Sequence, residues 1–82
     1  MKYTIKFKSR AIKEMKVLSQ LESARIMCKI EALTDNLSGD VKRLTNFMPA
    51  YRLKVGDYRV LFEIDAEVVV IYRKKHRKEA YR

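Results

Sequence analysis

Residues 50–64 read AYRLKVGDYRVLFEI, and this pattern predicts a β-hairpin. Apolar and polar residues alternate on both sides of the Gly56-Asp57 dipeptide, which is typical of a tight turn between two strands. A two-residue turn would pair the flanking residues Val55 and Tyr58. One face of the hairpin is then apolar and belongs to the core, while the other face carries the charged side chains.

The polar face of this hairpin is crowded with cations. The expected register places Lys54 directly opposite Arg59, and Arg52 shares their face. Like charges directly opposite each other repel, so the arrangement lowers stability unless an anion binds between them. The pattern therefore indicates a site for an anionic group such as a phosphate.

The whole chain is short and basic. Its 82 residues include 19 Lys and Arg against 10 Asp and Glu, which gives a formal net charge of +9. We expect a single small domain, residues 1–82, with a true core, because 48% of the residues are hydrophobic and only two are Gly. The charge favours a polyanionic partner, with nucleic acid first, an acidic protein second and a membrane surface third.

The location and the cysteine can also be assessed from the sequence. No apolar run approaches the roughly 18 residues of a membrane-spanning helix, and the first residues lack the apolar core of a signal peptide. We therefore expect a cytoplasmic protein. The single cysteine, Cys28, lies in a helical pattern and is expected to be buried rather than reactive.

Periodicity before the hairpin predicts one strand and two helices. Residues 2–8 alternate as a strand does, and a short helix capped by Ser9 should follow and end near Ser19. A second helix, capped by Ser23, should end near residues 38–39. Two helices joined so closely form a helical hairpin.

The remaining segments complete the predicted architecture. Residues 40–48 show no sustained period and are expected to form a loop, whereas residues 68–72 are apolar throughout and predict a central strand buried on both faces. A basic tail follows that strand. The order β-α-α-β-β-β predicts an α+β fold in which the helical hairpin packs on one face of a small, mostly antiparallel sheet and leaves the other face open.

The hairpin sequence, the Val-rich strand after it and the segment HRKEAY at residues 76–81 resemble the RelE family of bacterial toxins. The similarity in length, element order and charge extends over essentially the whole chain. It implies a type II toxin-antitoxin system, in which the toxin cuts messenger RNA in the ribosomal A site and a cognate antitoxin wraps around the toxin to inactivate it. It implies no cofactor.

The resemblance also implies which residues act in catalysis. The two basic positions of the family fall on Arg52 and Lys54, and the arginine after the hairpin turn falls on Arg59. The carboxy-terminal basic residue and tyrosine of the family fall on Arg77 and Tyr81.

The alignment of the basic tail leaves alternatives open. Many relatives carry Val-Gly before the His-Arg pair, where this chain has Lys74-Lys75, so Lys75, His76 and Arg77 are three candidates for the catalytic cation. Further contacts to RNA are expected from Lys42, Arg43, Lys74, Lys75 and His76.

RNA can be cleaved without a metal when its 2′-OH attacks the adjacent phosphorus. One group must take that proton, another must protonate the leaving 5′-oxygen, and cations must stabilise the extra negative charge. Tyr81 is the first candidate for the base, because nearby cations favour a phenolate, and Lys54 is the competing candidate. Arg59 would hold the phosphate with its planar guanidinium. His76 is an easier acid than Arg77, because an arginine holds its proton above about pH 12.

Two other functions remain open. The related ParE toxins use the same fold to poison DNA gyrase without cutting RNA, and a plain RNA-binding module would bind RNA with steep salt dependence but leave it intact. A metal site is not expected, because the acidic cluster Glu63, Asp65 and Glu67 has no ligand histidines near it in the sequence.

Overall fold

The computed structural model describes residues 2–79. Its elements are β1 (Thr4–Phe7), α1 (Ser9–Lys16), α2 (Gln20–Ala32), β2 (Val41–Arg43), β3 (Tyr51–Val55), β4 (Tyr58–Asp65) and β5 (Val68–His76). The five strands form one sheet in the order β1-β5-β4-β3-β2. The β1–β5 pair is parallel and the other pairs are antiparallel.

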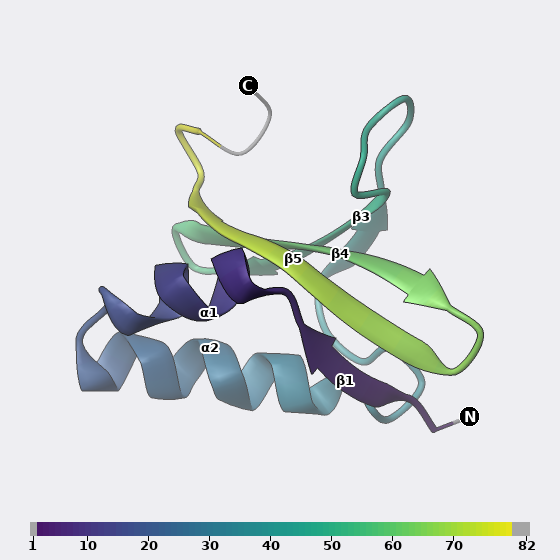
Figure 1. Ribbon diagram of the computed structural model, residues 1–82, viewed down its shortest axis with the longest axis horizontal. Helices are drawn as coiled ribbons and strands as arrows, with labels where there is room; N and C mark the ends of the chain where they lie inside the picture. The colour runs from purple at the N-terminus through teal and green to yellow at the C-terminus, as the bar shows by residue number, and fades with distance from the viewer. Residues whose placement is uncertain (1, 80–82) are drawn as a thin grey trace.

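The two helices form one layer beneath the sheet and leave its opposite face uncovered (Figure 1). This arrangement confirms the α+β class and the helical hairpin on one face. The helices contribute the buried Ile26 and Ile30, and the sheet contributes Leu53, Phe62 and Ile71. Each such side chain contributes roughly 1.5–3 kcal/mol through burial. The main core cluster therefore lies between the helices and one face of the sheet.

The register of the central hairpin is confirmed. Val55 pairs with Tyr58 across the two-residue turn, and Lys54 pairs with Arg59. Gly56 has a φ of +57°, which is the left-handed conformation that such a turn requires and that glycine adopts without a steric cost.

The predicted helix caps are wrong. Ser9 is the first residue of α1, and the cap position is Lys8, whose side chain makes no capping bond. The cap of α2 is Ser19 and not Ser23. The hydroxyl of Ser19 accepts a hydrogen bond from the backbone N–H of Glu22 at 3.2 Å. The motif S-x-x-E at residues 19–22 is the usual sequence signal for this cap, and it was missed.

Both helices end earlier than predicted. Helix α1 ends at Lys16 rather than near Ser19, because Ser19 already has the extended backbone of the next cap. Helix α2 ends at Ala32 rather than near residues 38–39, and residues 36–37 take positive φ angles of 58° and 57°. The apolar spacing continues past the end of α2, but the backbone N–H groups of residues 33–35 bond to carbonyls three positions back, and two left-handed residues follow.

The structure contains more β-strand than predicted, in two places. The expected loop at residues 40–48 contains β2, which is ordered by pairing with β3 and is too short to show a period of its own. Strand β5 continues past Tyr72 to His76, because β4 supplies pairing partners as far as Tyr58. The first part of the predicted basic tail is therefore a strand.

Two burial predictions also need correction. Strand β5 lies inside the sheet as expected, but only Val69 and Ile71 of residues 68–72 are buried, so burial on both faces is wrong. Cys28 is exposed rather than buried. It follows Ile26 by two positions and therefore lies on nearly the opposite side of the helix. No helix within residues 2–79 is long and apolar enough to cross a membrane.

Candidate functional site

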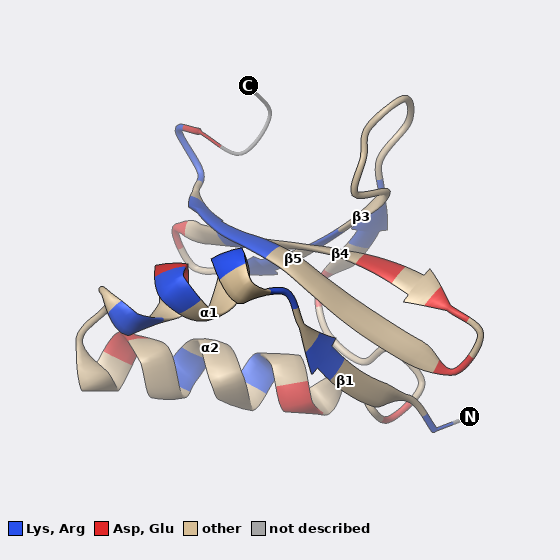
Figure 2. Ribbon diagram, viewed as in Figure 1, with Lys and Arg blue, Asp and Glu red and all other residues tan. Residues whose placement is uncertain are grey.

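Three cations form a row across the uncovered face of the sheet. Lys54 of β3 pairs with Arg59 of β4, and Arg59 pairs with Lys75 of β5. Lys54 lies between the core residues Leu53 and Val55, so it points away from the helices. Neighbouring strands are about 4.8 Å apart, so the cation row spans roughly 10 Å. Figure 2 shows Lys and Arg positions, in blue, on β3 and toward the end of β5.

A β-bulge brings Lys75 into the cation row. Val69 and Ile71 face the core, and uninterrupted alternation would place Lys75 on the same side. The register shifts, however, so that Phe62 pairs with Ile71 but Leu61 pairs with Arg73. The extra residue on β5 reverses the alternation beyond it. Lys75 therefore shares a face with Lys54 and Arg59.

Arg59 is held in place by its own turn. Its Nη1 donates hydrogen bonds to the carbonyl oxygens of Gly56 at 2.9 Å and Tyr58 at 3.0 Å. The other nitrogens of the guanidinium have no hydrogen-bond partner within residues 2–79. This fixed orientation leaves donors for the two oxygens of a phosphate.

Lys42 and Arg52 form a second pair on the same face. They are registered neighbours on β2 and β3, and Arg52 is two residues from Lys54. The Arg52 side chain is only 12% exposed, and its Nη1 lies 3.4 Å from a carboxylate oxygen of Asp40. Its buried Nε has no hydrogen-bond partner in the described part of the chain. Arg52 thus already has a counterion within the protein.

The other basic residues of the predicted RNA-binding set lie on the covered side. His76 pairs with Tyr58 and contacts its ring edge-on, with centroids 5.8 Å apart. Lys74 places its ammonium 5.1 Å from the centre of the same ring. Arg43 lies over Tyr51, which stacks on the core residue Phe62.

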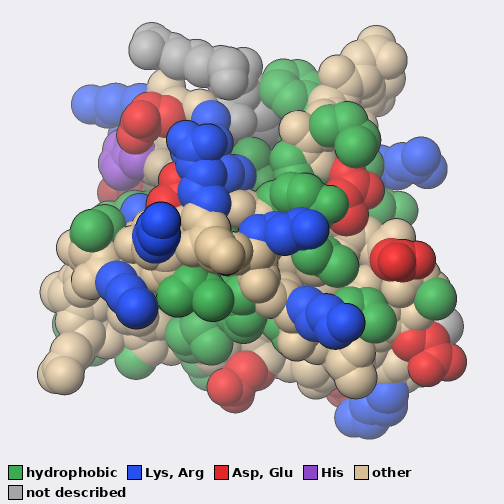
Figure 3. Space-filling view, in the orientation of Figure 1, with side chains coloured by type: hydrophobic (Ala, Val, Ile, Leu, Met, Phe, Trp, Pro, Cys, Tyr) green, Lys and Arg blue, Asp and Glu red, His purple; other side chains and the backbone are tan. Residues whose placement is uncertain are grey.

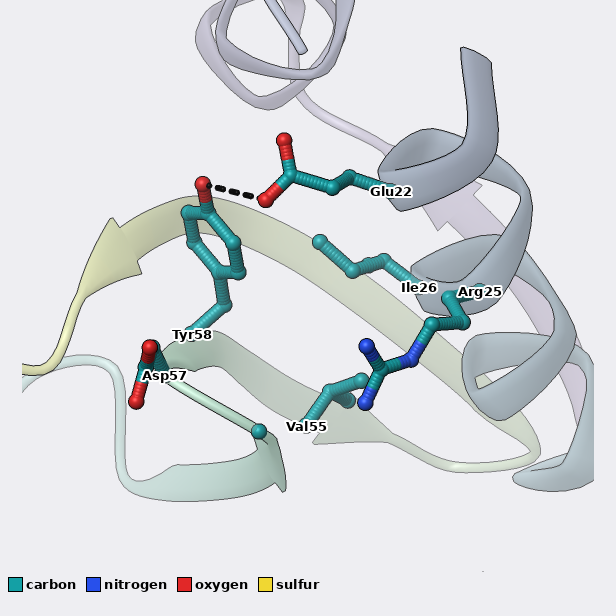
Figure 4. Close-up of a pocket in the computed structure, with 7 residues that line it drawn as sticks. Glu22, Arg25, Ile26, Val55, Asp57 and Tyr58 are labelled. Carbon is teal, nitrogen blue, oxygen red and sulfur yellow. Dashed lines mark hydrogen bonds between the residues drawn. The ribbon is translucent and has the colours of Figure 1, made fainter. Parts of the chain in front are cut away.

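Tyr58 is anchored to α2 by Glu22, as Figure 4 shows. The phenol donates a hydrogen bond of 3.1 Å to the Glu22 carboxylate. This bond, together with burial and the negative charges of Glu22 and Asp57, raises the pKa of Tyr58 above its ordinary value. Tyr58 is therefore a support for the end of β5 and a poor candidate for a base. The cavity beside it is about 80 Å³ and is too small for a nucleotide.

The chain beyond β5 is tied to the hairpin turn. The backbone N–H of Arg77 donates a hydrogen bond to the carbonyl of Asp57 at 2.7 Å, and the two side chains approach to 3.8 Å. Arg77 thus lies at the end of the cation row rather than in it. Tyr81 lies outside the described residues.

Glu14 of α1 anchors β5 from the other side. Its carboxylate accepts hydrogen bonds from Nε and Nη2 of Arg73 and from the backbone N–H of Lys74. Burial opposes ionisation of Glu14, but these bonds and the charges of Arg73 and Arg10 outweigh it and hold its pKa below the ordinary value. The two partners are 59 positions apart, so no local pattern reveals this contact.

Two segments flank the uncovered face. The loop at residues 44–50 and the chain after β5 both rise away from the helices (Figure 1). The loop is closed by a bond from the N–H of Leu44 to the carbonyl of Ala50, and the N–H of Ala50 donates to the carboxylate of Glu63. The cations extend from Lys42 at the foot of this loop to Lys75 near the end of β5. Within residues 2–79, no three His, Cys, Asp or Glu side chains are grouped as a metal site would need.

Comparisons with known proteins place the chain in a family. Residues 5–81 match the family model described as ParE toxin of type II toxin-antitoxin system, parDE. Over 54 residues, the chain is 30% identical to Toxin RelE3 of Methanocaldococcus jannaschii; this match covers 66% of the chain and 61% of the relative's length.

Solved structures agree with this family. The toxin-antitoxin complex RelBE2 from Mycobacterium tuberculosis contains a chain that matches with a TM-score of 0.80, 26% identity and coverage of 93% and 99% of the two chains. The archaeal RelE-RelB complex from Pyrococcus horikoshii contains one that matches with a TM-score of 0.77, 25% identity and coverage of 98% and 100%. The chain therefore belongs to the RelE/ParE family of type II toxins.

Proposed function

We propose that this toxin is an endoribonuclease that cleaves messenger RNA in the ribosomal A site and is neutralised by a cognate antitoxin. The observation that carries the proposal is the row of Lys54, Arg59 and Lys75 on the uncovered face of the sheet. Three cations in adjacent positions repel one another, and a phosphate that gains negative charge during cleavage would relieve that repulsion.

We propose the following roles for the candidate residues. Arg59, fixed at the centre, would bind the scissile phosphate with its guanidinium. Lys54 and Tyr81 remain the two candidates for the base that takes the 2′-OH proton. Among the three candidates for the remaining cation, the register favours Lys75 over His76 and Arg77, because Lys75 alone is a registered neighbour of Arg59. No step of this reaction needs a metal ion.

The dependence on the ribosome has a physical rationale. The cations lie on an open face, and alignment of the 2′-OH with the phosphorus and the leaving oxygen requires the RNA backbone to be held in one conformation. A ribosome that fixes the codon would supply this alignment, which an open protein surface supplies poorly. We therefore expect naked RNA to be a much poorer substrate than ribosome-bound messenger RNA.

An antitoxin is proposed on two grounds. The similar chain from M. tuberculosis is part of a toxin-antitoxin complex, and the similar chain from P. horikoshii is part of a RelE-RelB complex. In addition, an apolar groove of about 240 Å³ lies between α1, α2 and β1, and its lining includes Phe7, Ile12, Met15 and Met27. Figure 3 shows hydrophobic side chains gathered there between Lys and Arg side chains. Such a groove fits an amphipathic segment with acidic residues at its edges.

Growth assays test the antitoxin. Expression of the chain alone should arrest growth, and coexpression of the cognate antitoxin should restore it. An Ile12→Asp toxin should still arrest growth but should escape neutralisation, whereas Val17→Asp, at a residue that is 80% exposed outside the groove, should still be neutralised. Equal neutralisation of both variants would argue against this groove.

Inhibition of DNA gyrase is the second candidate, because the matching family model is named after the ParE toxin. The two functions are separated by parallel assays of purified protein on ribosomes programmed with messenger RNA, on naked RNA and on gyrase-driven supercoiling. Cleavage that requires ribosomes, with supercoiling unaffected, is the expected result. Inhibited supercoiling with intact RNA would overturn the nuclease proposal, and RNA binding without cleavage would indicate a plain RNA-binding module.

A further inference from the structure

Glu14 of α1 covers a part of β5 that has a partner strand on one side only. Strand β1 pairs with β5 as far as Phe7 and Ile71, and the chain then turns into α1. Within residues 2–79, the end of β5 therefore has no strand beside it at this edge. Helix α1 contacts β5 instead (Figure 1). Its Glu14 carboxylate accepts a hydrogen bond of 3.0 Å from the backbone N–H of Lys74, as a partner strand would.

The bond from Lys74 depends on the β-bulge. Backbone groups of a regular strand point alternately to its two sides. The carbonyl of Ile71 points toward β1, where it accepts a hydrogen bond of 2.8 Å from the N–H of Lys8. Lys74 lies three positions beyond Ile71, so in a regular strand its N–H would point to β4. The extra residue at the bulge turns this N–H to the free edge, where Glu14 accepts it.

The same bulge decides on which face of the sheet Lys75 lies. With the bulge, Lys75 pairs with Arg59 in the cation row. Without it, the pairing of Phe62 with Ile71 would continue by regular steps, and Lys75 would lie opposite Tyr58 on the covered side. A slip of one residue would thus remove Lys75 from the row.

Glu14 is held firmly enough to favour one register over the other. Its neighbours Ala11 and Met15 are buried, which fixes α1 against the sheet. The Glu14 side chain is only 21% exposed, and hydrogen bonds of 3.0 and 2.8 Å from Nε and Nη2 of Arg73 orient its carboxylate. A carboxylate that is shielded and oriented in this way makes stronger hydrogen bonds than one in water.

We infer that Glu14 is a positioning residue for the proposed ribonuclease: by accepting the N–H of Lys74 it stabilises the bulged register and so places Lys75 beside Arg59. The inference rests on the proposed RNA cleavage and adds a residue that acts without touching the substrate. Loss of the carboxylate should allow the end of β5 to pair without the bulge in most molecules.

NMR on the isolated full-length chain measures the register without RNA. Val60 pairs with Lys74. Because the N–H of Lys74 points away from β4, this is the closely spaced kind of antiparallel pair, and the two Hα protons should give a strong cross-peak. Without the bulge, Val60 would face Arg73 instead. In Glu14→Ala, the cross-peak of the Val60 Hα should move from Lys74 to Arg73.

Single-turnover cleavage on programmed ribosomes measures the consequence for Lys75. Glu14→Ala should lower the rate by about 10-fold or more, as expected for loss of a hydrogen bond to a charged group. In the Lys75→Ala protein, Glu14→Ala should cause no further loss, because the register then no longer matters. A residue that only stabilised the fold would not show this dependence on Lys75.

Two further variants serve as controls. Ile30→Val removes a buried methyl group from α2, which lowers stability but leaves the hydrogen bonds of β5 in place. It should keep the contact between Val60 and Lys74 and the wild-type rate. Glu14→Gln keeps an oxygen that can accept the N–H, so it should lie between wild type and Glu14→Ala in both measurements. It replaces Glu14→Ala if that variant does not fold.

The results separate this inference from the proposed function. An unchanged contact between Val60 and Lys74 in Glu14→Ala would overturn the inference, and so would losses of rate from Glu14→Ala and Lys75→Ala that multiply. The nuclease proposal would survive either result. If the register shifts as expected but the wild-type protein leaves messenger RNA intact on ribosomes, the proposed function fails and only the control of the register by Glu14 is supported.

Discussion

The two faces of the sheet differ in what their neighbouring side chains do to one another. On the covered face, Leu53, Val60 and Phe62 are fully buried and support each other by packing. On the uncovered face, the same two strands carry Lys54 and Arg59, which repel each other. Residues that fold the chain and residues that destabilise it thus alternate along one hairpin, which is typical of a site kept for function.

The covered face should respond most strongly to truncation. Phe62→Ala removes a ring that is fully buried in the centre of the core and that stacks on Tyr51. The free energy of unfolding should fall by about 3–5 kcal/mol because a cavity is left behind. Urea denaturation followed by circular dichroism measures this loss. A loss below about 1 kcal/mol would show that the helical layer does not depend on this face.

On the uncovered face, the largest effect should be on rate. Lys75→Ala should lower ribosome-dependent cleavage by about 10²–10³-fold, as expected for loss of a group that stabilises transition-state charge. His76→Ala, one residue further along β5 and on the covered side, should change the rate much less. Single-turnover cleavage on programmed ribosomes measures both variants. A larger loss of cleavage rate for His76→Ala than for Lys75→Ala would show that His76, and not Lys75, belongs to the site.

The ion pair between Glu14 and Arg73 links helix α1 to strand β5. Glu14→Gln should lower the free energy of unfolding at pH 7 by about 1–3 kcal/mol, because charged hydrogen bonds are lost. The folded protein holds the pKa of Glu14 below its ordinary value of 4.5, so this stability is present above that pH and is lost as pH falls through the lowered pKa.

The difference between wild type and Glu14→Gln should therefore shrink as the solution is acidified below about pH 4.5. Denaturation at a series of pH values tests this, with Glu67→Gln at an exposed turn position as the control. A difference that is constant with pH would mean that the contribution of Glu14 is packing rather than charge.

The smallest predicted effect is a gain in stability. Lys54→Gln removes one member of the repelling pair, so the free energy of unfolding should rise by about 0.2–1 kcal/mol. The gain should diminish as salt screens the charges. Lys6→Gln is the control, because the registered neighbour of Lys6 is the uncharged Val70. Destabilisation by Lys54→Gln at low salt would show that the row is not under electrostatic strain.

The central hairpin, including two residues of the site, was easier to predict from the sequence than the rest of the sheet. The Gly56-Asp57 turn and the alternation around it were enough to derive the hairpin and the Lys54–Arg59 pair, because both signals are local. Strand β2 was not predictable in this way, since three residues show no period and the strand depends on its pairing with β3.

The position of Lys75 shows why local patterns are not sufficient for the site. Strict alternation from Val69 would assign Lys75 to the core side, and only the bulge between β4 and β5 reverses this. The bulge arises from how two strands pair and leaves no signal in either strand alone. The same holds for Glu14, whose partner Arg73 is distant in the sequence.

Cleavage of RNA on the ribosome by the uncovered cation row can be tested in one experiment. The most direct measurement maps messenger RNA ends by primer extension after purified protein is added to programmed ribosomes, with Arg59→Ala and the helix-face variant Lys74→Ala in parallel. We predict cuts in the A-site codon for the wild type and for Lys74→Ala, and their loss for Arg59→Ala while its fold is retained. Intact messenger RNA with folded, antitoxin-free wild-type protein, or undiminished cutting by Arg59→Ala, would contradict the claim.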